Sequence, residues 1–455
     1  MSDPIDRRSF LKQAGAAGLG LSVLNLPATA VRGAETEPAL AHRKVGPNDK
    51  LTVAVIGTNG RGLAHIGCLT GLPGAEIAYI CDVDDRAIEK GLKATARHQA
   101  NAPKGLKDFR KALEDKSLDA VTIAAPDHWH APMAILALAA GKHVYVEKPC
   151  SQNPYEGELL LQAIARYGGV VQMGNQRRSF PNMQKAVSQI HDGKIGKAYF
   201  ARAWYDNHRG SIGHGKDASV PEWLDYDLWQ GPAPRVPFRD NLIHYNWHWF
   251  WHWGTGEALN NGTHEVDVCR WALGVDWPAR VSSNGGRYQF QDDWETPDTQ
   301  VIAWDFAEGK TISWEGRSCN GFPVENLERG ALIYGTEGVA LLDSNSYTFF
   351  DKKKKVLEQV KEHEAADPTD TVSASGIGLD RLHVANFLDA IRTGSRPNSP
   401  IEEGHKSVTM LHLGNIAWRV GRELHCDTAN GHIKDDDQAM KLWRRDYEPG
   451  WEPKV

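Results

Sequence analysis

Two segments of the sequence carry side chains that could move a proton to or from a hydroxyl group. One is Glu147-Lys148-Pro149, and the other places His264 within the run from Gly254 to Asp267. A lysine that lies in a cleft beside a positively charged aromatic ring of a bound molecule has a lowered pKa, so it can accept a proton near neutral pH. Histidine titrates in that range without perturbation. Lys148 and His264 are therefore candidate catalytic residues.

A glycine-rich turn follows a buried strand predicted at 51–56. The turn spans Gly57 to Gly62, a helix is predicted from 63 to 72, and a second buried strand at 76–81 ends at Asp82. This arrangement is typical of dinucleotide binding, because the glycines admit the pyrophosphate and the acid binds the ribose hydroxyls. Asn59 takes the place of the second glycine of the usual pattern. Asp82 would repel a 2′-phosphate, so NAD is favoured, while Arg86 leaves NADP open.

Strands and helices continue to alternate up to Gly174. Strands are predicted at 118–125, 143–149 and 169–173, with helices at 131–140 and 155–167. This alternation predicts a doubly wound parallel sheet, the Rossmann arrangement, over residues 50–174. Pro126, His130 and Lys148 lie at the carboxyl ends of predicted strands, which face the ligand crevice in such a sheet.

The second half of the chain has a different pattern. Strands are predicted at 197–205, 280–289, 300–306, 310–315, 331–334 and 338–342, with helices at 379–391 and 404–420. Residues 175–455 are therefore predicted to form an α+β domain with an open, largely antiparallel sheet. Its last helix is expected to return to the first domain, and residues 351–378 are predicted to form a loop.

Tryptophan is concentrated in this second half. The chain has 16 Trp, and from Trp247 to Trp253 every second residue is one. This alternation predicts a strand with an aromatic face. Such a face could belong to a core or an interface, or it could stack against sugar rings. A helix predicted from about 257 to 273 would place Asn260, His264 and Asp267 along one face, where Asp267 could orient His264 or cap a polar network.

Composition excludes several classes of protein. With 41% hydrophobic and 24% charged residues, the chain resembles an ordinary globular enzyme, and a net charge of −6 argues against a nucleic-acid binder. Six cysteines without a CxxC motif argue against a disulfide scaffold or a clustered zinc site. His128 and His130 form a pair without a compact third ligand, so no metal site is predicted.

The first residues resemble a twin-arginine export signal. Arg7-Arg8 precede a Gly/Ala-rich apolar run, and Ala28-Thr29-Ala30 resembles a cleavage site. Residues 1–34 are therefore predicted to be a signal peptide with a leader that the twin-arginine export machinery recognises, and the protein is predicted to be periplasmic. The apolar run is too short and too rich in glycine for stable membrane insertion.

Glu147-Lys148-Pro149 and the 254–267 segment resemble two motifs of the glucose–fructose oxidoreductase, inositol dehydrogenase and MocA (Gfo/Idh/MocA) family. The resemblance extends from residue 50 to the end of the chain. It implies an NAD(P)-dependent enzyme for sugars or cyclitols, often a homo-oligomer that associates through the open sheet. The 175–178 segment resembles the entry to the substrate domain, where a basic residue lies near the active site. Asn260 stands where the family has an aspartate, which shifts the role of base from His264 toward Lys148.

Strand ends and family motifs together define two sets of predicted site residues. The predicted cofactor-binding residues are Gly57, Thr58, Asn59, Gly60, Arg61, Gly62, Asp82, Pro126, His130, Glu147 and Lys148. The predicted substrate-binding residues are Lys148, Arg178, Tyr205, Trp251, Asn260 and His264.

These residues predict an oxidoreductase that transfers a hydride between tightly bound NAD and a secondary hydroxyl of a sugar, glycoside or cyclitol. One alternative is a redox-neutral NAD-dependent glycosidase or lyase that acts through a keto-sugar. Another is a sugar-binding protein without catalysis. Steady NADH formation, glycoside cleavage without net NADH, or binding alone would distinguish the three hypotheses.

Overall fold

The computed structural model describes residues 42–43, 45–46, 49–362 and 377–455. The export signal and leader predicted at 1–34 lie outside these residues. A large part of the loop predicted at 351–378 also lies outside them.

The first sheet is parallel and has six strands in the order β3-β2-β1-β4-β5-β6. Its central strands β1, β4 and β5 are buried along almost their whole length, because helices cover both faces. This arrangement confirms the predicted Rossmann sheet. The strands are β1 (Leu51–Ile56), β2 (Ala75–Cys81), β3 (Lys104–Leu106), β4 (Ala120–Ile123), β5 (His143–Val146) and β6 (Val171–Met173).

Two helices of this domain, α3 and α6, begin at residues whose side chains cap them. Asp84 accepts a hydrogen bond from the backbone of Arg86 at the start of α3, and Asn153 does the same for Glu156 at the start of α6. Pro154 occupies the first turn of α6, where no backbone donor is needed. The helices are α2 (Arg61–Thr70), α3 (Asp85–Ala96), α4 (Arg110–Leu113), α5 (Asp127–Ala139) and α6 (Pro154–Tyr167).

The second sheet has nine strands in the order β14-β13-β12-β11-β7-β10-β9-β8-β15. Only β7 and β10 run parallel, so the prediction of a largely antiparallel sheet is confirmed. Buried and partly exposed residues alternate along β9 and β10, as expected for a sheet covered on one face. The strands are β7 (Ala198–Asp206), β8 (Arg280–Gly286), β9 (Thr299–Phe306), β10 (Lys310–Arg317), β11 (Arg329–Gly335), β12 (Gly338–Asp343), β13 (Ser346–Asp351), β14 (Val356–Val360) and β15 (Leu424–His425).

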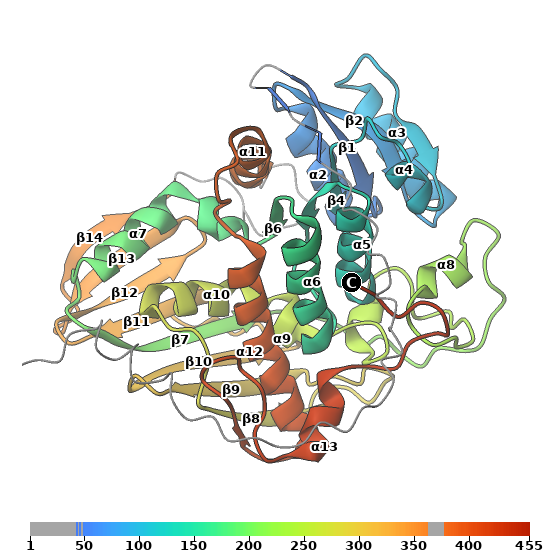
Figure 1. Cartoon of the computed structure of the whole chain (residues 1–455). Coiled ribbons are helices and arrows are strands. Elements are labelled where there is room, and N and C mark those ends of the chain that lie inside the picture. The colour runs from blue at the N-terminus through green and yellow to red at the C-terminus, as the bar shows by residue number, and fades with distance from the viewer. Residues whose placement is uncertain (1–41, 44, 47–48, 363–376) are drawn as a thin grey trace, which may run out of the picture. The chain divides into compact units, whose positions relative to one another are not determined.

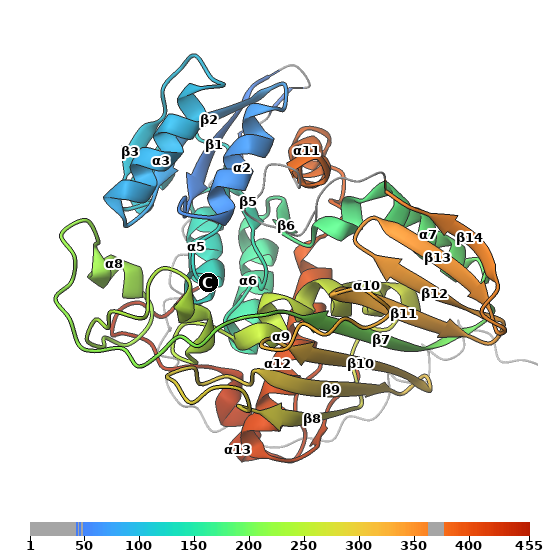
Figure 2. The same ribbon diagram turned by 180° about the vertical axis from the view of Figure 1, so that it is seen from behind.

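Helices connect the two sheets. Figures 1 and 2 show α10 lying on the second sheet while α11 and α12 lie beside the first domain. α11 packs against α2, and α12 packs against α6. The helices of this half are α7 (Pro181–His191), α8 (Tyr226–Gln230), α9 (Gly256–Asn260), α10 (Gly262–Leu273), α11 (Ile377–Thr393), α12 (Ile401–Val420) and α13 (Asp437–Met440), with short 3₁₀ helices η1 (Gln176–Ser179), η2 (Asn246–Trp249) and η3 (Lys441–Trp443).

Three local predictions were wrong. β14 lies inside the segment predicted as a loop, because its partly buried residues pair with β13. The aromatic strand predicted at 247–253 is instead η2 followed by a turn. This compact shape lets its tryptophans reach different partners: Trp249 stacks on Trp294 with ring centres 3.9 Å apart, and Trp253 meets Trp229 edge-on. The helix predicted from 257 to 273 breaks at Asn261, between α9 and α10.

Candidate active site

A cavity of about 540 Å³ lies at the carboxyl ends of β1, β2, β4 and β5. The glycine turn and Asp82 line it from the first domain, together with Lys148. From the second domain it is lined by residues of β7, η2, α9, α10 and β11. Ligands bind at this edge of open parallel sheets, so the position fits a site between cofactor and substrate.

The glycine turn leaves room for a phosphate group. Gly57 has φ +83°, and a Cβ there would lie 2.5 Å from the carbonyl oxygen of Ala124. A Cβ at Gly62 would lie 1.8 Å from the carbonyl oxygen of Gly57, so both positions require glycine. Gly60 lines the cavity, and a Cβ there would meet no atom within 4 Å. The amino end of α2 therefore opens toward the cavity, which suits a pyrophosphate.

Asp82 couples the second strand to this turn. Its two carboxylate oxygens accept hydrogen bonds from the backbone amides of Thr58 (2.6 Å) and Asp84 (3.0 Å). Asp82 also lines the cavity, where each carboxylate oxygen keeps a lone pair for a ribose hydroxyl. Thr58 itself is fully buried and donates its hydroxyl to the carbonyl of Ala87, so it supports the turn from behind.

Arg61 and Glu147 belong to one buried ion network. Arg61 donates to Glu147 at 2.7 Å and to Asp380 of α11 at 2.5 Å, while His65 lies 3.0 Å from Glu147. Burial alone would raise the pKa of Glu147, but Arg61 and His65 hold it well below its usual range. Both residues border the cavity. Their side chains tie the glycine turn, β5 and α11 together, so we expect them to shape the nucleotide site.

Lys148 emerges from the end of β5 into the cavity. Its Nζ donates to the backbone carbonyl of Asn260 and lies 3.2 Å from the side-chain oxygen of the same residue. Burial lowers the pKa of Lys148, although Glu147 and Asp127 act in the opposite direction. A lysine with a lowered pKa can exchange a proton with a hydroxyl group near neutral pH.

His264 lies in the first turn of α10 and also lines the cavity. Burial holds its pKa well below the usual value, and the positive charges of Lys148 and Arg329 act in the same direction. The ring is therefore neutral at pH 7 and can either donate or accept a hydrogen bond. The break at Asn261 turns α10 so that His264, Asn260 and Lys148 meet at one wall.

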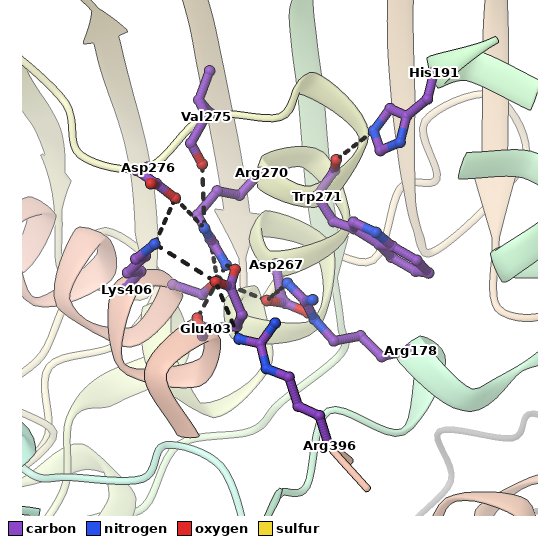
Figure 3. A network of polar contacts seen from close by, with 11 residues as sticks. Arg178, His191, Asp267, Arg270, Trp271, Val275, Asp276, Arg396, Glu403 and Lys406 are labelled. Carbon is purple, nitrogen blue, oxygen red and sulfur yellow. Dashed lines mark hydrogen bonds and ion pairs between the residues drawn. The ribbon is translucent and has the colours of Figure 1, made fainter. Parts of the chain in front are cut away.

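Asp267 does not orient His264. It receives two hydrogen bonds from Arg178, at 2.7 and 2.9 Å, and one from Ser407 at 2.7 Å. Figure 3 shows this pair within a larger network that links α10 to α12 through Arg270 and Glu403. A buried guanidinium needs a carboxylate partner, and Asp267 supplies it. The prediction that Arg178 binds substrate is therefore not supported, because Arg178 does not line the cavity.

Trp251, another predicted substrate residue, also lies away from the cavity lining. Its ring packs against Trp418 and under the guanidinium of Arg419, 4.9 Å from the ring centre. Tyr205 does line the cavity, and its hydroxyl accepts a hydrogen bond from Asn207 at 2.6 Å. This side of the cavity is therefore polar and aromatic, although it does not include Trp251.

His130 and Pro126 border the cavity at the end of β4. The two ring nitrogens of His130 lie 2.7 Å from the carbonyl oxygen of Ala125 and 2.5 Å from that of Pro149. These contacts join the ends of β4 and β5 beneath the site.

Three further basic side chains line the cavity. Arg209 is paired with Glu257 at 2.6 Å and donates to the hydroxyl of Tyr245 at 2.8 Å. His248 of η2 and Arg329 of β11 line the same cavity. No sequence spacing relates η2 and β11 to the motifs, so only the fold reveals these residues.

No group of three or more His, Cys, Asp or Glu among the described residues is arranged to hold a metal ion. Within the same ranges, no helix has the length and apolar character needed to cross a membrane.

Two family models match the chain. Residues 51–175 match the NAD-binding Rossmann fold of the Gfo/Idh/MocA oxidoreductase family, and residues 201–452 match its C-terminal alpha/beta domain. A "Glycosyl hydrolase family 109 protein" of Parabacteroides distasonis is 39% identical over 85% of this chain and 88% of its own length. An "Alpha-N-acetylgalactosaminidase" of Tannerella forsythia is 36% identical over the same shares of the two chains.

Solved structures show the same fold. A levoglucosan dehydrogenase in complex with NADH and levoglucosan superimposes with a TM-score of 0.63 at 18% identity, over 83% of this chain and 99% of its own. The six-stranded parallel sheet, the nine-stranded mixed sheet and these matches lead to one assignment. The chain belongs to the Gfo/Idh/MocA oxidoreductase family and contains an NAD-binding Rossmann domain.

Proposed function

We propose that this protein is an NAD-dependent glycosidase that oxidises a ring hydroxyl, cleaves the glycosidic bond and restores the hydroxyl within one catalytic cycle. The observation that carries the proposal is the meeting of Lys148 and His264, both with lowered pKa, in a cavity beside the glycine turn. The two glycosidase relatives, each matched over 85% of this chain, support cleavage over simple oxidation.

The residues around the turn fit NAD. The open amino end of α2 at Gly60 would receive the pyrophosphate, and Asp82 would receive the ribose hydroxyls. When bound, NAD supplies a reversible hydride acceptor for the carbon that carries the hydroxyl. Because that hydride returns to the sugar, the cycle needs no external oxidant.

Lys148 and His264 would manage the proton of the reacting hydroxyl. The neutral forms of both groups can accept it, and their protonated forms can return it when the ketone is reduced. Asn260 fixes Lys148 through its carbonyl and side-chain oxygens, so the amine is positioned before substrate arrives. Tyr205 would hold another sugar hydroxyl, since its own hydroxyl faces the same cavity.

The substrate class follows from the relatives. One is named an alpha-N-acetylgalactosaminidase, so α-linked N-acetylhexosaminides are the first glycosides to test. Purified protein would be mixed with aryl α-N-acetylgalactosaminide, and phenol release and absorbance at 340 nm would be followed together. We expect phenol release without net accumulation of NADH. Accumulation of NADH and of a keto-sugar, with the aglycone still attached, would reject the glycosidase.

That second result would support a dehydrogenase, the other function compatible with the site. The observation that favours a dehydrogenase is Lys148 in the segment Glu147-Lys148-Pro149, which resembles a motif of the family. A lysine at this position is sufficient for the oxidation of a hydroxyl group and does not require cleavage of a glycosidic bond. In that case the keto product would leave and a second substrate would reoxidise the nucleotide.

We also propose that the protein is exported to the periplasm by the twin-arginine route. The Arg7-Arg8 pair and the cleavage-like Ala28-Thr29-Ala30 support this proposal. Cell fractionation would test it, with Arg7→Lys combined with Arg8→Lys as the comparison. Equal distribution of both proteins between periplasm and cytoplasm would reject it.

A further inference from the structure

His248 presents a free nitrogen to the active-site cavity. It belongs to η2 and lines the cavity, and its Nδ1 lies 2.6 Å from the backbone carbonyl oxygen of Tyr245. A carbonyl oxygen can only accept a hydrogen bond, so Nδ1 must carry the proton. In a neutral ring the other nitrogen, Nε2, then holds an unshared electron pair. Among the described residues, no hydrogen-bond partner is recorded for this Nε2.

The ring of His248 is held rigidly and kept neutral. It stacks on Trp247 with centres 3.6 Å apart and planes 19° apart, and it touches Tyr245 at 4.6 Å between centres. Burial holds the pKa of His248 well below the usual value, and the positive charges of Lys148 and Arg209 act in the same direction. A fixed, neutral imidazole with one free lone pair has the properties of a general base.

Several other ionisable groups around the cavity are already bound, and Glu328, which also lines it, is an exposed residue at the amino end of β11. Asp127 accepts the hydroxyl of Thr255 at 2.6 Å, and Glu257 is paired with Arg209. His244 lies 2.7 Å from Asp84. Lys148 and His264 serve the reacting hydroxyl in the proposed cycle, whereas His248 has no role there.

Cleavage by the proposed cycle requires a second proton transfer, at carbon. Once a ring carbon is a ketone, the hydrogen on the neighbouring carbon becomes acidic, and its loss allows the glycosidic oxygen to leave. We propose that Nε2 of His248 is the base that removes this hydrogen as a proton and later returns a proton, exchanged with solvent, to the same carbon. This assignment rests on the proposed glycosidase function.

The two steps balance with water as the only co-reactant. His248 takes the proton, the C–H electron pair forms a C=C bond, and the bond from the anomeric carbon to the glycosidic oxygen breaks. The leaving oxygen keeps that electron pair and takes a proton from water to give the alcohol. The hydroxyl of that water adds to the anomeric carbon, and His248 returns a proton to the neighbouring carbon. The sum of these two steps is hydrolysis.

The decisive variant is His248→Asn. The amide of asparagine can replace Nδ1 as a donor to Tyr245, but it has no basic nitrogen in place of Nε2. Three quantities would be measured: aglycone release, deuterium incorporation beside the former ketone during turnover in D₂O, and the first-turnover reduction of bound nucleotide at 340 nm. We expect the first two to fall at least ~100-fold, while nucleotide reduction stays within about threefold of the wild type.

His252→Asn is the matched control, because His252 belongs to the same Trp-rich segment but bonds to the carbonyl of Pro234 outside the cavity lining. It should leave all three measurements unchanged. A second variant, His248→Ala, should regain cleavage when free imidazole is added, which a purely structural role would not produce. Nucleotide reduction by the variants shows that they are folded.

The outcomes separate the two proposals. If the wild type cleaves substrate and incorporates deuterium but His248→Asn does both at a similar rate, His248 is not the base and the glycosidase remains. If the wild type reduces its nucleotide without cleavage or deuterium incorporation, the glycosidase is rejected, and the role of His248 is rejected with it.

Discussion

Lys148 combines burial with direct access to the cavity, which makes its amine the residue whose loss should be most specific for chemistry. Lys148→Ala removes an acid–base group, so turnover should fall at least ~100-fold. The nucleotide should stay bound, because the turn that receives it does not depend on this side chain. Turnover and the nucleotide content of the purified variant would be measured together.

Lys142 provides a matched control for this variant. It lies just before the start of the same strand, is buried, and donates to the carbonyls of Asp115 and Leu118 far from the catalytic end. Lys142→Ala should lower stability while the remaining folded protein keeps its turnover. Similar losses of turnover in both variants would mean that Lys148 acts through the fold and not through proton transfer.

Asp82 should decide between the two nicotinamide nucleotides. Its carboxylate faces the place where the adenosine ribose would lie, so Asp82→Ala should weaken NAD binding and reduce the preference over NADP. Titration of both nucleotides by calorimetry would give the ratio of dissociation constants. Asp85→Ala is the control, since Asp85 is an exposed partner of Lys107 just beyond the strand. An unchanged ratio for Asp82→Ala would exclude contact with the ribose.

The sequence located some of these residues better than others. Lys148, Asp82 and the glycines follow directly from strand ends, because parallel strands bring their carboxyl ends to one edge. Arg178 and Trp251 do not line the cavity, and their partners Asp267 and Arg419 are too distant in sequence for the pattern to reveal them. His248 could not be identified as a base, because its tautomer depends on a local carbonyl bond in a 3₁₀ helix that the Trp alternation did not predict.

At the level of elements, one segment of the second domain closes over the nucleotide-binding domain. Figure 2 shows the part of the chain around α8 lying beside α3 and β3. The backbone of Trp223 accepts a hydrogen bond from Asp85 at 3.0 Å, and the guanidinium of Arg86 lies 3.3 Å from the centre of the Trp223 ring. His244 lies 2.7 Å from Asp84. The segment therefore borders the side of the cavity that contains Asp82.

This closure should slow the release of nucleotide. Trp223→Ala combined with His244→Ala removes the ring contact with Arg86 and the contact with Asp84. This double variant should increase the dissociation rate of the nucleotide at least ~10-fold, the change expected for a loss of about 1.4 kcal/mol. The rate would be measured by chasing bound NADH fluorescence with excess NAD. Arg239→Ala, which loses bonds to Gly215 and Asp293 within the same domain, should change it little. Equal dissociation rates in the wild type, the double variant and Arg239→Ala would show that the segment does not retain nucleotide.

The elements themselves were largely predictable where hydrophobic periodicity is strong. The buried strands β1, β2, β4 and β5 and the long helix α12 appear close to their predicted bounds. β3, with three residues, carries too little pattern to detect, and the break between α9 and α10 depends on packing at Asn261. The closing segment around α8 also could not be predicted, because it is stabilised by its own cluster of aromatic side chains that meet only in the fold.

At the level of the whole molecule, buried neutral histidines join the returning helices to the first domain. His383 of α11 bonds to the hydroxyl of Ser179 at 2.6 Å and to the carbonyl of Met173 at 2.9 Å. His412 of α12 bonds to the carbonyl of Ser151. Burial lowers the pKa of His143, His383 and His405 to about 4 and that of His412 to about 3.

These histidines should make the protein unstable in mild acid. The folded pKa of each lies below the unfolded value of about 6.5, so the unfolded chain binds more protons once the pH falls below 6.5, and stability decreases from there toward pH 4. At pH 5 the loss is about 2 kcal/mol for each histidine, or about 8 kcal/mol for four. With an unfolding entropy of about 0.9 kcal/mol/K for roughly 400 residues, the Tm should fall by roughly 9 °C between pH 7 and pH 5.

Calorimetry at pH 7.0, 6.0 and 5.0 would measure this slope. His412→Gln keeps a donor for the Ser151 carbonyl but cannot take up a proton, so its Tm should fall by about 2 °C less than that of the wild type over the same pH range. His98→Gln, at an exposed position in the first domain, should reproduce the wild-type slope. A His412→Gln slope that matches the wild type would mean that carboxylates, and not the histidines between the helices and the first domain, control acid unfolding.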